Sequence, residues 1–459
     1  MKAKILTALF VLSVLGMCPA LWPDQQPDMA ARGGITMGGA ASTDDRVSTE
    51  TNPQLTYQEY RLEITGDAKP SDKARLYAEA WLRSAGTSSN VTSAADLFTL
   101  GRVAPVALDL LEAWFELKGF IFDNVDLKIG RQRVAWGTAD RLNPTDNVNA
   151  YDLTDIWDFG RHLGSDGVQL SVYAGGLQLT GLAIPVFTPA VLPQGAAASA
   201  LTSTSSTGFP GMTVSGVTTS VVLPSSSLAD SLSAGLKVSG NLLGYDLSVS
   251  YLYGRQGLPI VDKTVVTPTG ASSVAVASEL IYPREHIFGA DLAGSLWGVG
   301  VWAEAALFLP EKVTLTADLS ALTMGVQQSV ALDSAPFVKY AIGGDYTFPA
   351  NIYINAQYLH GFVQEAGQGN LKDYFVVNVD WRLLEDRIKL TPINVVVEVS
   401  NWNDVSNNHA ILAAPSITLH PVDNAELVIG VHWIQATSST AYAGMSGKNE
   451  VFAHARYSF

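Results

Sequence analysis

The stretch YFVVNVDWRL, residues 374–383, alternates in character at every second position. The odd positions from 375 to 383 are all apolar, whereas the even positions include Asn378, Asp380 and Arg382. An amphipathic helix would need apolar spacings of three and four, so period two predicts a β-strand with one apolar and one polar face.

The same alternation recurs along most of the chain. About 17 segments read as strands by this criterion. They are 55–64, 75–83, 108–118, 121–130, 167–175, 177–186, 232–240, 244–254, 286–294, 299–308, 337–347, 351–358, 374–383, 387–400, 411–420, 426–433 and 450–459. The fold class expected is therefore all-β.

The connections between these segments alternate between short and long. Tight turns are expected near 175–176, 240–244, 294–298, 349–350, 385–386 and 421–424, and long polar or small-residue stretches lie between them. Antiparallel transmembrane β-barrels have short periplasmic turns, long outer loops and an even number of strands. We predict an up-and-down barrel of 16 or 18 strands, with residues 35–42 as a weak additional strand or 55–64 outside the wall. A soluble exported β-sandwich would also alternate, but it rarely needs so many strands in one run.

The C-terminal strand carries a second indication of a barrel. Val451, Ala453, Ala455, Tyr457 and Phe459 alternate up to a terminal aromatic residue. This ending resembles the C-terminal sorting signal of outer-membrane barrels, in which Tyr457 and Phe459 would be read by the barrel-assembly machinery. The resemblance implies insertion into outer-membrane lipid of a Gram-negative cell.

The N-terminus has the form of a signal peptide. Lys2 and Lys4 precede an apolar run from residue 5 to 17, and Ala20 closes a small-residue cleavage site. A lipid anchor at Cys18 is the less favoured reading, because Met17 is bulky where a small residue is wanted. We therefore divide the chain into a signal peptide (1–20), an N-terminal periplasmic lead-in or small plug (21–54) and a transmembrane β-barrel (55–459).

Composition narrows the functional classes. The 459 residues are 47% hydrophobic and only 15% charged, and the formal charge is −15. Cleavage would remove Lys2 and Lys4, leaving 26 basic against 43 acidic residues, a charge of −17. That acidity argues against a nucleic-acid partner, because the negatively charged phosphate backbone binds basic surfaces. No run of ~18 apolar residues follows the signal, so no membrane-spanning helix is predicted.

Residues 129–167, IGRQRVAWGTADRLNPTDNVNAYDLTDIWDFGRHLGSDG, form an unusually charged connection. Here the sequence resembles uncharacterised outer-membrane proteins and, more distantly, alginate-export-type porins. The resemblance lies in Gly130-Arg131-Gln132, in Trp136-Gly137 and in the residues 143–146, NPTD. It implies a strand and loop at the pore, where arginine meets acidic solutes. Alginate exporters have a strongly basic lumen, however, and this acidic chain departs from that pattern.

Three hypotheses remain open for residues 131–166. The loop could fold into the lumen as a constriction, it could be a surface loop held by its own salt bridges, or its Asp and Asn oxygens could bind a divalent cation. No metal site is assigned, because the spacing matches no EF-hand loop. The pore-lining or constriction candidates are Arg131, Arg133, Asp140, Arg141, Asp146, Asp155, Asp158, Arg161, Asp380, Arg382, Glu398 and Glu426.

Motifs for catalysis are missing from the sequence. It contains no Gly-x-Ser-x-Gly, His-Glu-x-x-His or Walker motif, and its single Cys falls in the signal peptide, which excludes covalent haem. We predict no enzyme activity and no cofactor. The expected function is a porin for small hydrophilic solutes or ions; the alternative is a structural barrel, a sheath for a partner such as a cytochrome, or a surface-adhesion barrel. Homotrimers are common among general porins, but no sequence feature here defines an interface.

Overall fold

The structure is a computed structural model, and it describes residues 34–85, 91, 93–193 and 212–459. The expected signal peptide, residues 1–20, lies outside the described residues. No helix among the described residues is long and apolar enough to cross a membrane.

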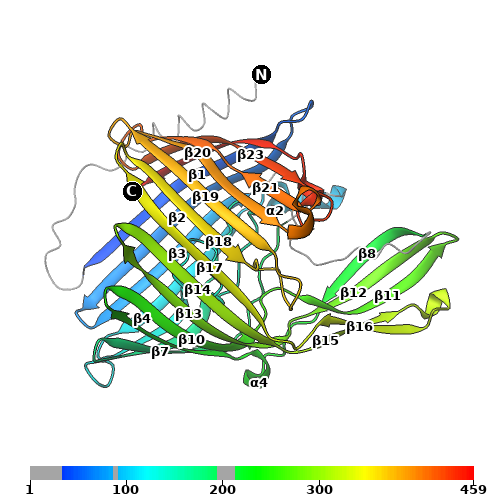
Figure 1. The fold of residues 1–459 in the computed structure, drawn as a ribbon, viewed down its shortest axis with the longest axis horizontal. Coiled ribbons are helices and arrows are strands. Elements are labelled where there is room, and N and C mark those ends of the chain that lie inside the picture. Colours follow the sequence, from blue (N-terminus) through cyan, green and yellow to red (C-terminus); the bar gives the residue numbers. More distant parts are fainter. Residues whose placement is uncertain (1–33, 86–90, 92, 194–211) are drawn as a thin grey trace.

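The main body is a closed antiparallel barrel of 18 strands, as the alternation predicts (Figure 1). The wall strands are β1 (Ile35–Ser48), β2 (Leu55–Ser71), β3 (Ala74–Ala85), β4 (Ala107–Leu117), β5 (Val125–Gln132), β6 (Ser165–Ala174), β7 (Leu177–Ile184), β9 (Ser233–Leu242), β10 (Tyr245–Arg255), β13 (Arg284–Leu296), β14 (Val299–Pro310), β17 (Phe337–Phe348), β18 (Ile352–His360), β19 (Asp373–Leu383), β20 (Ile388–Val399), β21 (His409–Ala413) with β22 (Ser416–Leu419), β23 (Ala425–Ala436) and β24 (Glu450–Ser458). Segments β21 and β22 both pair with β20 and β23, so they are two parts of one wall strand. Pro415 lies at the break, where a residue without an N–H cannot continue the ladder.

The barrel closes through β1, which corrects the expected domain boundary. β1 pairs with β2 on one side and with β24 on the other, from Ala40 opposite Ser458 to Ser48 opposite Glu450. Residues 35–48 therefore belong to the wall, and the barrel begins some twenty residues before position 55. This strand makes the count even and resolves it as 18 rather than 16.

The two ends of the barrel differ as predicted. At one end, here called the turn end, neighbouring strands are joined by tight turns such as Leu243-Gly244 and Trp297-Gly298, whose residues all have positive φ. Glycine at the second position of each adopts that conformation without steric cost. The opposite end, here called the loop end, carries the long connections. The tight turns lie at the left of Figure 1 and the long connections at the right.

Three long connections form a second, five-stranded sheet at the loop end. Its strands, in spatial order, are β16 (Val326–Leu332), β15 (Val313–Asp318), β11 (Ile260–Gly270), β12 (Ser273–Ile281) and β8 (Thr213–Val221). Strands β11 and β12 form an antiparallel hairpin within this sheet, with Val266 opposite Val276 and Thr264 opposite Ser278. The short helices are η2 (Ala94–Phe98), α2 (Leu100–Val103), α4 (Leu228–Ser231), η3 (Ser320–Leu322), η4 (Trp402–Asn407) and η5 (Ala443–Met445).

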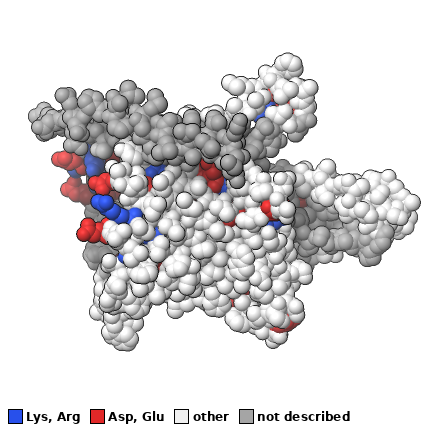
Figure 2. Space-filling model, turned by 90° about the horizontal axis from the view of Figure 1, so that it is seen from above, with Lys and Arg blue, Asp and Glu red and all other residues white. Residues whose placement is uncertain are grey.

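The outward face of the wall is apolar. Val249, Ile342 and Ile429 point outward and are more than half exposed, although they lie in the middle of their strands. An outward row of aromatic rings crosses neighbouring strands toward the loop end, where the rings of Tyr340 and Tyr358 have centroids 5.8 Å apart and Tyr358 and Phe375 5.3 Å apart. Figure 2 shows a wall made mostly of uncharged residues, with charged side chains gathered toward one end.

Candidate functional site

Residues 133–164, between β5 and β6, cross the lumen and are called the inner loop. Glu304 on β14 accepts hydrogen bonds from the Thr138 amide at 2.9 Å and from the Thr145 hydroxyl at 3.1 Å. On β18, the Gln357 side chain accepts from the Asp140 amide at 3.0 Å. These contacts join strands that are far from β5 around the barrel, so the inner loop lies inside the barrel.

Gly137 permits this close approach. Its φ is +93°, and a Cβ atom there would lie 2.5 Å from both Glu304 Oε2 and Thr145 Oγ1. Neither the backbone conformation nor the space suits a larger residue. The Trp136-Gly137 pair that the sequence singles out therefore marks the point at which the inner loop meets β14.

The far side of the inner loop is fixed to β1 and β23. Arg46 on β1 donates two hydrogen bonds to Asp155, at 2.9 and 2.5 Å. Burial on its own raises the pKa of the Asp155 carboxyl, but Arg46 outweighs that effect and holds this pKa below its ordinary value. Nearby, the ring of Trp157 stacks on His432 at a centroid distance of 3.9 Å. We call the Arg46–Asp155 pair the latch.

Two apolar clusters pack the inner loop against half of the wall strands. Leu142, Leu153 and Ile156 pack into a buried cluster with residues of β14, β17, β18, β19, β21 and β23. Val134, Trp136 and Val148 pack into a second cluster with residues of β7, β10, β13, β14 and β17. Because each buried Leu or Ile side chain stabilises by about 2 kcal/mol, apolar burial fixes the inner loop more firmly than any single hydrogen bond does.

A polar cluster supports the inner loop from within. The Arg133 guanidinium contacts the Asp146 carboxylate, donates to Asn149 Oδ1 at 3.1 Å and lies 3.2 Å from the His162 ring. Burial lowers the pKa of His162, so this ring is neutral at pH 7. Arg161 forms a second ion pair, with Asp152, at 2.8 Å. The loop is thus held by its own salt bridges, as the surface-loop hypothesis supposes, but it lies in the lumen.

Arg131 does not line the lumen. It shares a strand face with the exposed Ile129, and its guanidinium pairs with Asp166 at 2.9 Å beside the exposed Val168. The next residue, Gln132, points inward and is almost fully buried beneath the inner loop. Strand alternation therefore places Arg131 on the outside of the wall near the loop end, and this candidate is excluded from the constriction.

The remaining candidates do not form one site. Arg133, Asp146, Asp155 and Arg161 are the paired residues described above. Asp140, Arg141 and Asp158 are the exposed charged residues of the inner loop, and Arg141 forms no ion pair with any described residue.

Asp380, Arg382 and Glu426 lie toward the turn end. On β19, Asp380 accepts a hydrogen bond from Thr391, and Arg382 follows on the same strand. On β23, Glu426 lies 3.7 Å from His420. Glu398 lies near the loop end, fully buried beside Lys372 at 3.2 Å. The three turn-end positions therefore lie at a different level from the inner loop, whereas Glu398 stands opposite Tyr374 and Ala410, which belong to the buried cluster around Leu153 and Ile156.

The side chains that receive the inner loop were not identified as its partners from sequence. Glu304 and Gln357 are 159 to 217 residues from the atoms they bind, and Arg46 belongs to the segment expected to be a lead-in. Their inward position on strands was the only available signal. Pairing over such distances is fixed by barrel closure and is not encoded locally.

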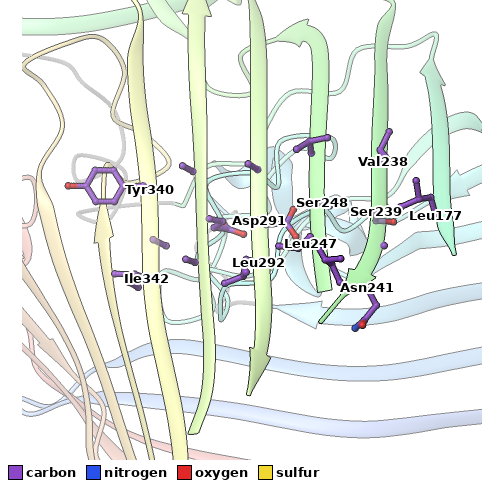
Figure 3. A pocket seen from close by; sticks show the side chains of 18 of the residues that line it. Leu177, Val238, Ser239, Asn241, Leu247, Ser248, Asp291, Leu292, Tyr340 and Ile342 are labelled. Atoms are coloured by element: carbon purple, nitrogen blue, oxygen red, sulfur yellow. Dashed lines mark hydrogen bonds between the residues drawn. The ribbon is translucent and has the colours of Figure 1, made fainter. Parts of the chain in front are cut away.

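Two hollows border the wall. The larger, about 1150 Å³, follows outward residues such as Leu177, Val238 and Ile342 across neighbouring strands, so it lies on the apolar outside (Figure 3). The other, about 610 Å³, is lined by Thr138 of the inner loop and by inward polar residues including Lys237 and Asp291. It is the chamber on the turn side of the inner loop. Among the described residues, no group of three or more His, Cys, Asp or Glu could hold a metal ion.

Comparisons with known proteins give only a distant likeness. No family model and no curated protein matches the chain. OmpF of Salmonella typhi in complex with daunomycin is 9% identical, with a TM-score of 0.41 over 93% of this chain and 97% of that one. OmpT, an outer membrane protein of Vibrio cholerae, is 8% identical with a TM-score of 0.41, over 95% of this chain and 100% of its own. A triple mutant of the Rhodopseudomonas blastica porin is 10% identical with a TM-score of 0.38, over 93% and 100%. These scores are low, so the barrel assignment rests on the strand pairing of this chain itself.

Proposed function

We propose that this protein is an outer-membrane channel through which small hydrophilic solutes or ions diffuse past the inner loop. The outward face supports the membrane location. Transmembrane β-barrels have an apolar outer band flanked by aromatic rings, and this wall has apolar residues in mid-strand and a row of aromatic rings toward the loop end. In this orientation the turn end faces the periplasm and the loop end faces the exterior. Phe459 lies at the periplasmic end of β24, where the barrel-assembly machinery would read it.

Barrel width supports a channel. Eight strands leave an interior filled by side chains, whereas 16 to 18 strands leave an aqueous lumen. The inner loop narrows this lumen without packing equally on all sides. Its apolar clusters cover the wall from β7 to β23, but no described residue of the inner loop forms a hydrogen bond, ion pair or ring contact with β2 or β3. This one-sided docking is the observation that carries the proposal, since it leaves β2 and β3 without such contacts, and the proposed path runs along them beside the inner-loop contact with Glu112 of β4.

The test is single-channel recording from the purified, signal-cleaved protein in a planar bilayer. Stepwise conductance is expected, and a variant lacking residues 138–160 should conduct more per step because it loses the body of the inner loop. Heat-modifiable mobility on gels establishes that each sample is a folded barrel. A folded barrel that stays silent would overturn the channel and favour a structural or adhesion barrel. The proposal assigns no catalytic role and no cofactor.

A further inference from the structure

The inner face of β2–β4 pairs each of its arginines with carboxylates. Arg61 lies 2.5 Å from Glu59, and Arg83 lies 2.6 Å from Asp109. Arg75 is paired with Asp67 at 2.8 Å. Because each of these cations has a partner of opposite sign at contact distance, none offers an unbalanced positive charge to a passing anion.

Three carboxylates on the same face have no such partner among the described residues: Glu79, Glu112 and Glu116, which stands opposite Lys128 in the register of β4 and β5. Glu79 on β3 stands directly opposite Glu112 on β4 in the strand register, and both side chains point into the lumen. Glu79 accepts hydrogen bonds from the Tyr77 hydroxyl and the Trp81 indole, each at 3.0 Å. Glu112 accepts from the Trp114 indole and from the Arg133 amide, also at 3.0 Å. All four donors are neutral groups, and neither glutamate is ion-paired with any described residue.

The nearby basic side chain on β5, that of Lys128, forms no ion pair with either glutamate. The ammonium of Lys128 lies 4.1 Å from the centre of the Trp114 ring and acts on Glu112 only through space. Like charges directly opposite on neighbouring strands are destabilising. The register of β3 and β4 therefore maintains a local excess of negative charge that packing alone would not favour.

Glu112 also lies at the level of the constriction. Its hydrogen bond from the Arg133 amide is made where the inner loop leaves the wall. Glu112 thus contacts the inner loop, and Glu79 stands opposite it on β3, a strand that forms no hydrogen bond or ion pair with a described residue of the inner loop.

We propose that Glu79 and Glu112 make this passage selective for cations and are its specificity-determining residues. The inference rests on the proposed channel function and adds the charge class of the preferred solute. A narrow, low-dielectric cleft lined by one sign of charge concentrates counter-ions, and rings of acidic side chains select cations in pores. Screening acts over about 10 Å at 0.1 M salt and about 3 Å at 1 M, so the selectivity must weaken as salt rises.

The test is the reversal potential of the reconstituted channel across a KCl gradient. The wild-type protein should pass K⁺ in preference to Cl⁻, and the preference should be larger at 0.1 M than at 1 M KCl. Glu79→Gln with Glu112→Gln should lower the permeability ratio about threefold while keeping the acceptor oxygens for Trp and Tyr. Arg83→Gln should raise the ratio, because it frees the negative charge of Asp109.

Glu385→Gln is the matched control, since this glutamate lies exposed in the β19–β20 turn; its ratio should equal the wild-type value. A conducting channel that is unselective or prefers Cl⁻, or a double variant with an unchanged ratio, would overturn the selectivity inference while leaving the channel intact. A bilayer without conductance would instead overturn the channel function itself. If the double variant does not fold, the salt dependence of the wild-type reversal potential decides the question.

Discussion

Arg46, on the first strand of the barrel, binds Asp155 of the inner loop across 109 residues of sequence through two hydrogen bonds. Both side chains are nearly buried, with exposed fractions of 7% and 11%. Asp44 also pairs with Arg46 at 2.6 Å, and the Tyr57 ring lies 4.2 Å from the guanidinium. The strand that closes the barrel is therefore also the strand that fixes the inner loop.

Breaking the latch should loosen the inner loop. Arg46→Met leaves the buried Asp155 carboxylate without its ion-pair partner and with only the Trp157 amide donating to it, which should lower the free energy of unfolding by about 3 kcal/mol. Urea titration in detergent measures this loss, and single-channel records should become noisier as the inner loop fluctuates. Adding Asp155→Asn should recover part of the loss, because the uncompensated charge is then removed.

Arg75→Met is the control for the latch. It also removes an arginine from an inward ion pair, but the pair with Asp67 is more exposed and does not touch the inner loop. The expected loss is below about 1 kcal/mol. Equal losses at the two arginines would contradict the role assigned to the latch.

The latch should also be insensitive to mild acid. The pKa of Asp155 is lower in the folded protein than its ordinary value of 3.8. A group with a lowered folded-state pKa contributes its full stability above its unfolded-state pKa and loses it as the pH falls through the folded-state pKa. Channel noise should therefore stay constant from pH 7 to 5 and rise only below about pH 4. A rise between pH 7 and 5 would contradict this and would point to the His432 ring that stacks on Trp157.

The barrel was largely predictable because a strand with one face toward lipid and the other toward water alternates apolar and polar residues. This pattern is visible within each short segment of the sequence. Each of the 17 predicted segments overlaps a wall strand, although residues 121–124 lie in the turn before β5. β1 was assigned to the lead-in because its outward face includes Gly39, Ala41, Thr43 and Asp45, which give no apolar period. Its place follows from pairing with β2 and β24, a relation between distant segments that local periodicity does not report.

The inner loop was recognisable from its charge, but its docking was not. The surface and lumen hypotheses predict the same internal salt bridges, and only contacts with the barrel wall, such as those with Glu304, Gln357 and Arg46, distinguish them. The position of Arg131, by contrast, was available from the sequence. It lies two residues after Ile129, so period two already places both side chains on the lipid-facing side.

Gly137 should be intolerant of a side chain for two separable reasons. Gly137→Ala forces an L-residue into positive φ and drives its Cβ into Glu304 and Thr145. Gly447→Ala is the matched control, because Gly447 has φ +78° but no described residue lies within 4 Å of the added Cβ. The free energy of unfolding should fall by about 1 kcal/mol in the control, from the backbone conformation alone. In Gly137→Ala it should fall by about 2 kcal/mol more, because of the clash. Urea titration measures both, and equal losses would show that the inner loop does not press against β14.

Arg131 and Arg133 should differ in effect although they are two residues apart. Arg131→Gln removes an outward ion pair and should leave conductance and reversal potential unchanged. Arg133→Gln withdraws the cation that Asp146 and Asn149 bind, so the inner loop should fluctuate and trypsin should cut faster after the exposed Arg141. Because the Asp146 carboxylate is buried, Arg133→Gln should also lower the free energy of unfolding by about 3 kcal/mol. A changed reversal potential in Arg131→Gln, with Arg133→Gln silent in every assay, would reverse the assignment of the two strand faces.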